Sequence, residues 1–277
     1  MKFIKFIGLI CLICFTFIYT EKIIDVSISQ DEIMIKLKEI EETYKIEPIN
    51  ATIKDDTIIP GNVGKYIDIE TSYKAMKKIG YFEESLISYK SIYPEISIYN
   101  HYNKYIIKGN TQKKQVSLIY ILNNNNTIDN ILSIINNKNT TISLFIDSSF
   151  LSNNIDIIYK INNHEIYNYG NNGTYTKDNL IITNNIINNK SNNNSIFCLF
   201  IKEESNSQNN NDSQNNCGNI KMLSIIPSIT GNYTNIKNNL QNGSIILINN
   251  TQELSSIIDY IKQKGYIISP LSTTISE

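Results

Sequence analysis

Short apolar runs alternate with amphipathic segments along residues 111–277. The apolar runs predict β-strands, which we place at Gln115–Leu122, 141–146, 195–201, 222–226 and 244–248. Between the first two strands, apolar residues recur at the spacing of one helix face, at Ile128, Ile131, Leu132 and Ile135. A weaker pattern predicts a short helix over 155–161. Repeated strand-then-helix units predict an α/β fold with a parallel sheet, either open or closed into a barrel.

The helix predicted after the last strand has the clearest boundaries in the chain. Asn250 is the expected N-cap, and Glu253 stands three residues later. Four apolar residues share one face: Leu254, Ile257, Ile258 and Ile261. Lys262 and Lys264 in the last turn, with Gly265 beyond them, predict where this helix ends.

Residues 21–110 have a different pattern. Ser29 and Glu32 have the spacing of a capping box, which predicts a helix that runs to about Lys45. Its apolar face is expected to consist of Ile33, Leu37, Ile40 and Tyr44. A turn is predicted at Pro60-Gly61-Asn62, and a second helix over 70–79 that ends at Gly80.

Charge is distributed unevenly along the chain. Residues 21–110 contain 15 acidic residues, 12 Lys and five Asn, whereas residues 111–277 contain 37 Asn and 22 charged residues. We therefore predict an N-terminal module at 21–110 and a second domain at 111–277, with the boundary near Asn110. The Asn runs at 123–126, 192–194 and 209–216 are expected in solvated loops.

The first 20 residues combine a basic start with an uncharged apolar run. Lys2 and Lys5 precede 14 uncharged residues at 6–19, which is the length of a secretory hydrophobic region and short for a membrane span. No small-x-small cleavage site follows. We expect an exported protein, secreted or held at the membrane, in which residues 1–20 are a signal peptide or an N-terminal anchor.

Composition narrows the classes of function. The chain has 58 Ile and 42 Asn but three Val, two Ala and no Arg or Trp, as a strongly AT-biased genome would produce. Its 25 Lys nearly balance 26 acidic residues, so there is no basic field to attract nucleic acid. Without Arg, the usual side chain for reading base edges is missing as well. No nucleic-acid partner is expected.

Two cysteines, Cys198 and Cys217, remain beyond the N-terminal segment. They can pair in an oxidising compartment or stay unpaired, and two cysteines alone do not distinguish these cases. Neither belongs to a CxxC pair, so we expect no metal site from them. About ten glycosylation sequons occur, among them Asn50, Asn139, Asn172 and Asn232, but a chain this rich in Asn produces several by chance.

The residues by themselves include few candidates for a catalytic site. His101 and His164 are too few for a multi-histidine metal site, and His164, next to Glu165 before an expected strand, is most simply structural. No GxSxG elbow, Gly-rich phosphate loop or HExxH motif occurs. The acidic residues of the second part are scattered and cannot be paired from their spacing: Asp129, Asp147, Asp156, Asp178 and Asp212.

Several stretches in a characteristic order resemble the polysaccharide deacetylases, the NodB-type domain of carbohydrate esterase family 4. The stretches are the strand at 113–122, the strand at 141–146, Asn163-His164-Glu165-Ile166, and the closing segments 242–247 and 254–266. Upstream, Pro60-Gly61-Asn62-x-Gly64, Asp68 and Ser72-Tyr73-Lys74-x-Met76 are similar to the N-terminal module of the sporulation-associated YlxY-type branch. The resemblance covers roughly residues 44–275 and is poor at about 175–220.

The resemblance implies a distorted (β/α) barrel with a small N-terminal helical module. It also implies an enzyme that binds a divalent metal such as zinc through one Asp and two His, with a second Asp as base and a late His as acid. Such enzymes remove acetyl groups from N-acetylglucosamine or N-acetylmuramic acid units. If the cleft still binds glycan, Tyr120 and Tyr169 are the candidate contacts.

The family's catalytic residues are replaced at the matching positions of this chain. The paired Asp fall on Ile121 and Leu122, and the metal-binding His on Tyr169 and Gly173. The third motif falls on 198–201 without an Arg, the fourth on Pro227, Thr230 and Gly231, and the acid His on Asn249. Aliphatic side chains can neither bind a cation nor accept a proton. We therefore expect neither a bound metal nor catalysis.

Three hypotheses follow for the function. The first is an inactive deacetylase-like protein of the cell envelope that binds glycan or an envelope protein, with a role in sporulation or cell-wall processes. The second is an active hydrolase of carbon–nitrogen bonds with an unusual ligand set, such as His164 with nearby carboxylates. The third is an Asn-rich secreted glycoprotein unrelated to deacetylases, which would have no parallel-strand barrel.

Overall fold

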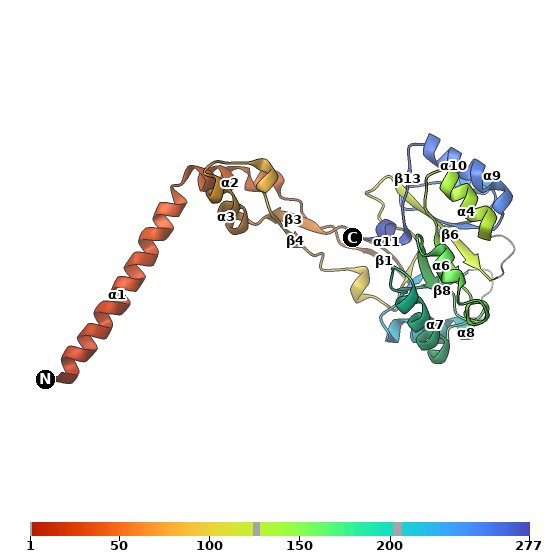
Figure 1. The fold of residues 1–277 in the computed structure, drawn as a ribbon, viewed down its shortest axis with the longest axis horizontal. Helices are drawn as coiled ribbons and strands as arrows, with labels where there is room; N and C mark the ends of the chain where they lie inside the picture. Colours follow the sequence, from red (N-terminus) through yellow and green to blue (C-terminus); the bar gives the residue numbers. More distant parts are fainter. Residues whose placement is uncertain (1, 124–127, 202–206) are drawn as a thin grey trace. The chain divides into compact units, whose positions relative to one another are not determined.

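The computed structural model describes residues 2–123, 128–201 and 207–277. They form two compact units, one built from Met1–Pro48 and Val63–Tyr93, the other from Ile49–Asn62 and Pro94–Glu277 (Figure 1). The sequence-based division at residue 110 differs from this one. Residues 94–110 and 49–62 pack with the second unit because each supplies strands to one of its sheets.

The first unit packs two helices beside a two-stranded antiparallel sheet. Its elements are α1 (Lys2–Ser29), α2 (Glu32–Tyr44), β3 (Gly64–Ile67), α3 (Ile69–Ile79), the 3₁₀ turn η1 (Glu84–Leu86) and β4 (Tyr89–Ile92). Ile33, Leu37, Ile67 and Met76 form its core, and Ile40 and Tyr44 pack against it. The apolar face predicted for the first helix is therefore confirmed. Over the described residues, no helix is both long enough and apolar enough to cross a membrane.

The predicted capping box at Ser29 is wrong. Ser29 is the last residue of α1, and its hydroxyl donates to the carbonyl of Val26 at 2.7 Å. The cap of α2 is Asp31, whose carboxylate accepts from the amide of Ile33 at 3.0 Å. The capping-box spacing is misleading here because an apolar helix already occupies the residues before it.

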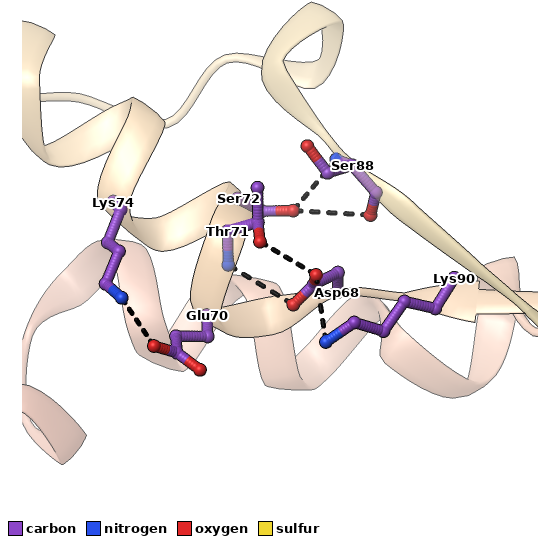
Figure 2. Close-up of polar contacts among 7 residues, drawn as sticks. All are labelled: Asp68, Glu70, Thr71, Ser72, Lys74, Ser88 and Lys90. Atoms are coloured by element: carbon purple, nitrogen blue, oxygen red, sulfur yellow. Dashed lines mark hydrogen bonds and ion pairs between the residues drawn. The ribbon is translucent and has the colours of Figure 1, made fainter.

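A polar network fastens α3 to β4 (Figure 2). The carboxylate of Asp68 caps α3 by accepting from the amide and hydroxyl of Thr71 at 3.3 and 2.7 Å, and it pairs with Lys90 of β4 at 3.0 Å. The hydroxyl of Ser72, which is buried, accepts from the amide of Ser88 at 2.9 Å. The Thr71 hydroxyl and Lys90 hold the pKa of Asp68 below its usual value. At the other end, α3 stops at Gly80, where φ is +84°, as predicted.

The second unit contains two mainly parallel sheets. One has the order β11-β12-β6-β7-β8, and β13 also pairs with the start of β6. Its strands are β6 (Gln115–Leu122), β7 (Ser143–Ile146), β8 (Glu165–Asn168), β11 (Ile229–Gly231), β12 (Ile245–Ile248) and β13 (Ile267–Ile268). The other has the order β1-β2-β5-β10-β9, parallel except between β1 and β2. Its strands are β1 (Thr52–Lys54), β2 (Thr57–Ile59), β5 (Tyr105–Ile106), β9 (Phe197–Leu199) and β10 (Leu223–Ile225).

Helices cover the outer face of the first sheet, and a second core lies between the two sheets. The helical segments are η2 (Ile98–Asn100), α4 (Ile128–Asn137), α5 (Ser148–Asn153), α6 (Ile157–Ile161), α7 (Lys177–Lys190), α8 (Ser207–Asn219), α9 (Tyr233–Asn239), η4 (Thr251–Glu253), α10 (Leu254–Gln263) and α11 (Leu271–Ile275). Alternate residues of β6 belong to different cores: Leu118 packs outward with α4 and α10, and Ile119 packs inward. In the inner core, the ring of Tyr167 contacts the rings of Phe145 and Phe197, and these contacts join the two sheets.

Side chains bridge the sheets where β8 and β9 lie next to each other. Asn193 accepts from the amide of Ile166 at 2.8 Å and donates to its carbonyl at 2.9 Å. The hydroxyl of Ser195 accepts from the amide of Asn168 at 3.0 Å. These contacts satisfy backbone groups that a regular strand neighbour would otherwise pair. The result is a distorted α/β barrel, which contradicts the hypothesis of an unrelated glycoprotein without a parallel-strand barrel.

Several helices of the second unit were not predicted from the sequence, and the longest of them are α7 and α8. In α7, Leu180 and Ile187 are buried while Ile181 and Ile182 are exposed, so the apolar residues do not follow one helix face. The Asn run at 209–216, expected in a loop, lies within α8. The run at 192–194 does lie between elements, and the run at 123–126 falls almost entirely outside the described residues.

Candidate functional site

The family's catalytic positions lie where the parallel strands of the second unit end. Ile121 and Leu122 close β6, and Tyr169 follows β8. Pro227 lies just beyond β10, and Asn249 directly after β12. The carboxyl ends of parallel strands form the usual place for a site in α/β folds. Here the positions of the family's paired Asp hold the aliphatic side chains of Ile121 and Leu122.

Tyr175 ties the ends of two of these strands together. Its hydroxyl lies 3.2 Å from the carbonyl oxygen of Asn168 in β8 and 3.2 Å from that of Leu199 in β9. It also accepts from the amide of Leu199 at 2.7 Å. The side chain is buried, and burial raises the pKa of Tyr175 well above its usual value. Nothing in the sequence distinguishes this tyrosine from the other 17.

Ile121 and Leu122 point into different cores. Leu122 is fully buried in the outer core against the helices, whereas Ile121 packs against the inner core between the sheets. Neither side chain carries an oxygen or nitrogen. At these two positions the site can supply neither a metal ligand nor a base.

Tyr169 and Gly173 are held close by the backbone. The amide of Gly173 donates to the carbonyl of Tyr169 at 3.1 Å, and Gly173 has a φ of +80°. A Cβ atom at residue 173 would lie 3.2 Å from the Tyr169 hydroxyl oxygen. Tyr169 is 3% exposed and belongs to the inner core, so its ring fills the space below the loop.

The two tyrosines expected to contact glycan are not brought together. Tyr120 is half-buried and packs at the edge of the outer core, whereas Tyr169 is buried in the inner core. Neighbouring residues of a strand face opposite sides of a sheet, and Tyr120 in β6 follows the inward-facing Ile119. Tyr169 therefore offers almost no surface for stacking.

The residues at this end of the barrel do not fit a catalytic metal. A zinc site needs about three nitrogen, oxygen or sulfur ligands. Tyr169 is the only one of the four family positions that carries such an atom, the others being Ile121, Leu122 and Gly173. Across the whole described part of the chain, no three His, Cys, Asp or Glu side chains gather to hold a metal ion.

One carboxylate does lie at this end, although its sequence spacing did not reveal it. Asp147 follows β7 and is 7% exposed. It accepts from the amides of Ser149 and Phe150, both at 2.9 Å, and from the amide of Asn172 at 2.7 Å. The first two hydrogen bonds cap α5, and the third ties the loop that carries Gly173 to the start of that helix. Asp147 therefore positions this loop against α5.

His164 and Glu165 lie at the opposite end of β8, where the strand begins. Glu165 accepts from the hydroxyl of Ser143 at 2.9 Å and from the hydroxyl of Ser272 in α11. Nδ1 of His164 is buried and has no hydrogen-bond partner among the described residues, and burial lowers the pKa of His164. The ligand set suggested around His164 is thus separated from the carboxyl ends of the strands.

Cys198 and Cys217, whose state the sequence left open, form a disulfide between β9 and α8. Both residues are fully buried and pack with Tyr175, Phe200 and Met222. Cys198 is the first residue of 198–201, where the family's third motif would fall. The disulfide therefore supports the same end of the barrel as Tyr175.

These features define the fold of carbohydrate esterase family 4, the polysaccharide deacetylases. The wild-type BA3943 protein of Bacillus anthracis, described as a pseudoenzyme of that family, has this fold with a TM-score of 0.64 at 20% identity, covering 90% of this chain and 96% of that one. The peptidoglycan N-acetylglucosamine deacetylase Bc1960 matches with a TM-score of 0.53 at 18% identity, over 62% of this chain and 94% of that one. The resemblance inferred from the sequence is confirmed.

Sequence similarity points to the same branch. The chain is 31% identical over 153 residues to the uncharacterized protein YlxY of Bacillus subtilis (strain 168), which covers 54% of this chain and 48% of YlxY. The chain thus matches about half the length of that curated relative. No family model matches the chain.

Proposed function

We propose that this protein is a non-catalytic, glycan-binding relative of the polysaccharide deacetylases that acts at the cell envelope. The observation that carries the proposal is the pair Ile121 and Leu122 at the end of β6, in the place of the family's paired Asp. Similarity to a protein described as a pseudoenzyme supports it.

The chemistry of the replaced positions supports inactivity. Deacetylation by a metal enzyme needs a bound water of lowered pKa to attack the amide carbonyl. Tyr169 and Gly173 stand in place of the two His ligands, so no metal is held there to activate that water. Asn249, at the position of the acid His, cannot protonate the departing amine at neutral pH. We therefore propose that the protein uses no metal cofactor.

The disulfide supports an extracytoplasmic location. Structural disulfides persist in oxidising compartments and are rare in the cytosol. We propose that residues 1–20 direct export and then either are removed or hold the protein at the membrane. Leu12, Phe15 and Ile18 of α1 are exposed apolar residues that a membrane surface would accept. The similarity to the YlxY-type branch is our reason for proposing a role in sporulation or cell-wall processes.

Sedimentation with insoluble peptidoglycan tests the binding half of this proposal. We expect the full chain to sediment with purified peptidoglycan and to be released by soluble peptidoglycan fragments. A Tyr120→Ala variant reports whether the half-buried tyrosine at the strand ends contributes. If the full chain stays in solution at every peptidoglycan concentration, the glycan-binding role is wrong, and an envelope protein becomes the candidate partner.

A further inference from the structure

An open cleft lies beside the loop after β8, the loop that carries Gly173. It has a volume of about 590 Å³ and is bounded by the start of α5, the loop after β8 and the first two turns of α7. Its lining is dominated by hydroxyl and amide side chains, including Ser149, Asn172, Thr174 and Thr183. Ile182, an exposed apolar residue, forms part of one wall.

The walls of this cleft are held rigidly by hydrogen bonds beneath them. Asn168 is fully buried, and its Oδ1 accepts from the hydroxyl of Ser148 at 3.2 Å and the amide of Gly170 at 2.7 Å. Its Nδ2 donates to Asn184 of α7 at 3.0 Å. One buried amide thus connects α5, the loop and α7. A binding site whose walls are fixed in advance loses less entropy when a ligand binds.

Three polar side chains in the lining have no partner within the described part of the chain. Asp178, in the first turn of α7, forms no ion pair or side-chain hydrogen bond there, and the side-chain amide of Asn172 forms none. Thr183 also lines the cleft, and its hydroxyl forms no hydrogen bond with any described residue. That hydroxyl is not one of the fully enclosed unpartnered atoms, so it can be reached from the cleft. All three groups are therefore able to form hydrogen bonds with a ligand.

The charge of the lining selects the class of ligand. No Lys or His lines the cleft, so a phosphate or carboxylate ligand has no counter-charge there. A single carboxylate, Asp178, is too little for a cation site. Hydroxyl, amide and carboxylate groups beside one apolar side chain match a neutral ligand with many hydroxyl groups.

We propose that this cleft, formed by α5, the loop after β8 and the start of α7, binds one or two uncharged sugar units of a glycan. The inference rests on the proposed glycan-binding function and assigns a site for it. Asp178 accepts from sugar hydroxyls, Asn172 contacts an acetamido or hydroxyl group, and the hydroxyl of Thr183 forms a hydrogen bond with the ligand.

Titration calorimetry of the full chain with N-acetylglucosamine tetrasaccharide tests this site. Thr183→Val replaces the unpartnered hydroxyl with a methyl group of similar shape, so folding should be unaffected. We expect this variant to raise the dissociation constant about fivefold, the effect of one lost hydrogen bond. Asp178→Ala should weaken binding by at least as much, and inorganic phosphate should not compete.

Thr274→Val is the matched control. The hydroxyl of Thr274 likewise has no partner in the described structure, but it is fully buried in α11, outside the cleft. We expect this variant to bind the tetrasaccharide like the unmodified chain. If the unmodified chain binds but Thr183→Val and Asp178→Ala bind equally well, the cleft is not the site and the glycan-binding function stands. If the chain binds neither the tetrasaccharide nor peptidoglycan, both proposals are overturned.

Discussion

Gly173 shows how the backbone at one residue disfavours a side chain that could bind a metal. At a φ of +80°, a side chain is strained whatever its chemistry, and a Cβ would also meet the Tyr169 hydroxyl at 3.2 Å. A histidine at residue 173 would therefore be strained unless the loop or the ring of Tyr169 shifted.

A pair of glycine substitutions measures this constraint. We expect Gly173→Ala to lower the free energy of unfolding by more than the roughly 1–2 kcal/mol that a left-handed backbone alone costs. Gly80→Ala is the control, because Gly80 has a similar φ of +84° and a Cβ placed there would have no atom within 4 Å. Urea unfolding of both variants compares them. An equal or smaller loss at Gly173 would show that Tyr169 does not crowd the loop.

His164 gives the stability a pH dependence that can be predicted in sign. Burial lowers the pKa of His164 from its ordinary value of 6.5, so below that value the unfolded chain binds a proton that the folded chain does not. The free energy of unfolding should therefore fall as the pH decreases from 6.5 toward the lowered pKa. Unfolding at pH 7.5 and 5.5 measures the difference, which a His164→Gln variant should reduce. An unchanged pH dependence in this variant would contradict the assignment.

Among the helices, the Asn-rich α8 is held by contacts that could not be predicted from its sequence. Its Cys217 is joined to Cys198, and Ser213 and Asn216 bind the backbone of Tyr175 at 3.0 and 2.9 Å. A helix with so few apolar residues gains little from burial. The disulfide and the hydrogen bonds to Tyr175 therefore hold α8 against the strands of the second unit.

Removing the disulfide should release this helix first. With a sequence separation of 19 between the cysteines, the double substitution Cys198→Ala and Cys217→Ala should lower the free energy of unfolding by about 3 kcal/mol. Hydrogen exchange should show faster exchange in α8 than in β6. The unmodified chain treated with a dithiol reductant should behave like the variant, and the variant should not respond to the reductant. Undiminished protection of α8 in the variant would contradict this account.

Strands with a uniform apolar character could be predicted from the sequence, and elements held by specific contacts could not. The strand Gln115–Leu122 and the face of α10 at Leu254, Ile257 and Ile261 are where the pattern placed them, because both are buried on a full side. α7 has apolar residues on two faces, and α8 has almost none, so neither has a period to detect. Tyr175, Asp147 and the cleft depend on distant segments meeting, which spacing along the chain does not reveal.

At the scale of the whole molecule, the second unit is assembled from two separate stretches. Residues 49–62 provide β1 and β2, and β5 precedes residue 111, yet all three belong to one sheet with β10. Ile58 and Ile106 of these strands are buried in the inner core. Charge distribution alone placed the boundary at residue 110 because it does not record strand pairing.

Truncated chains test whether the second unit needs β1, β2 and β5 in order to fold. A chain of residues 111–277 lacks β1, β2 and β5, so we expect it to lose cooperative unfolding and to bind the dye ANS. The control begins at residue 49 and carries a short Gly-Ser linker in place of residues 63–93. Both ends of that deletion lie near one segment, since the amide of Asn62 bonds to Ile49 at 2.8 Å and the amide of Ala51 bonds to Ile96 at 2.8 Å. This control should unfold cooperatively. Cooperative unfolding of 111–277 would contradict the account.

We propose that this barrel has the deacetylase fold without the family's hydrolytic chemistry. Acetate release from N-acetylated chitooligosaccharide and peptidoglycan, with zinc, cobalt or manganese supplied, tests this proposal. An active polysaccharide deacetylase assayed in parallel shows that the conditions are adequate. We predict no release above the protein-free background with any of the three metals. Metal-dependent release that disappears in a His164→Ala variant would contradict the proposal and place an unrecognised metal site at the start of β8.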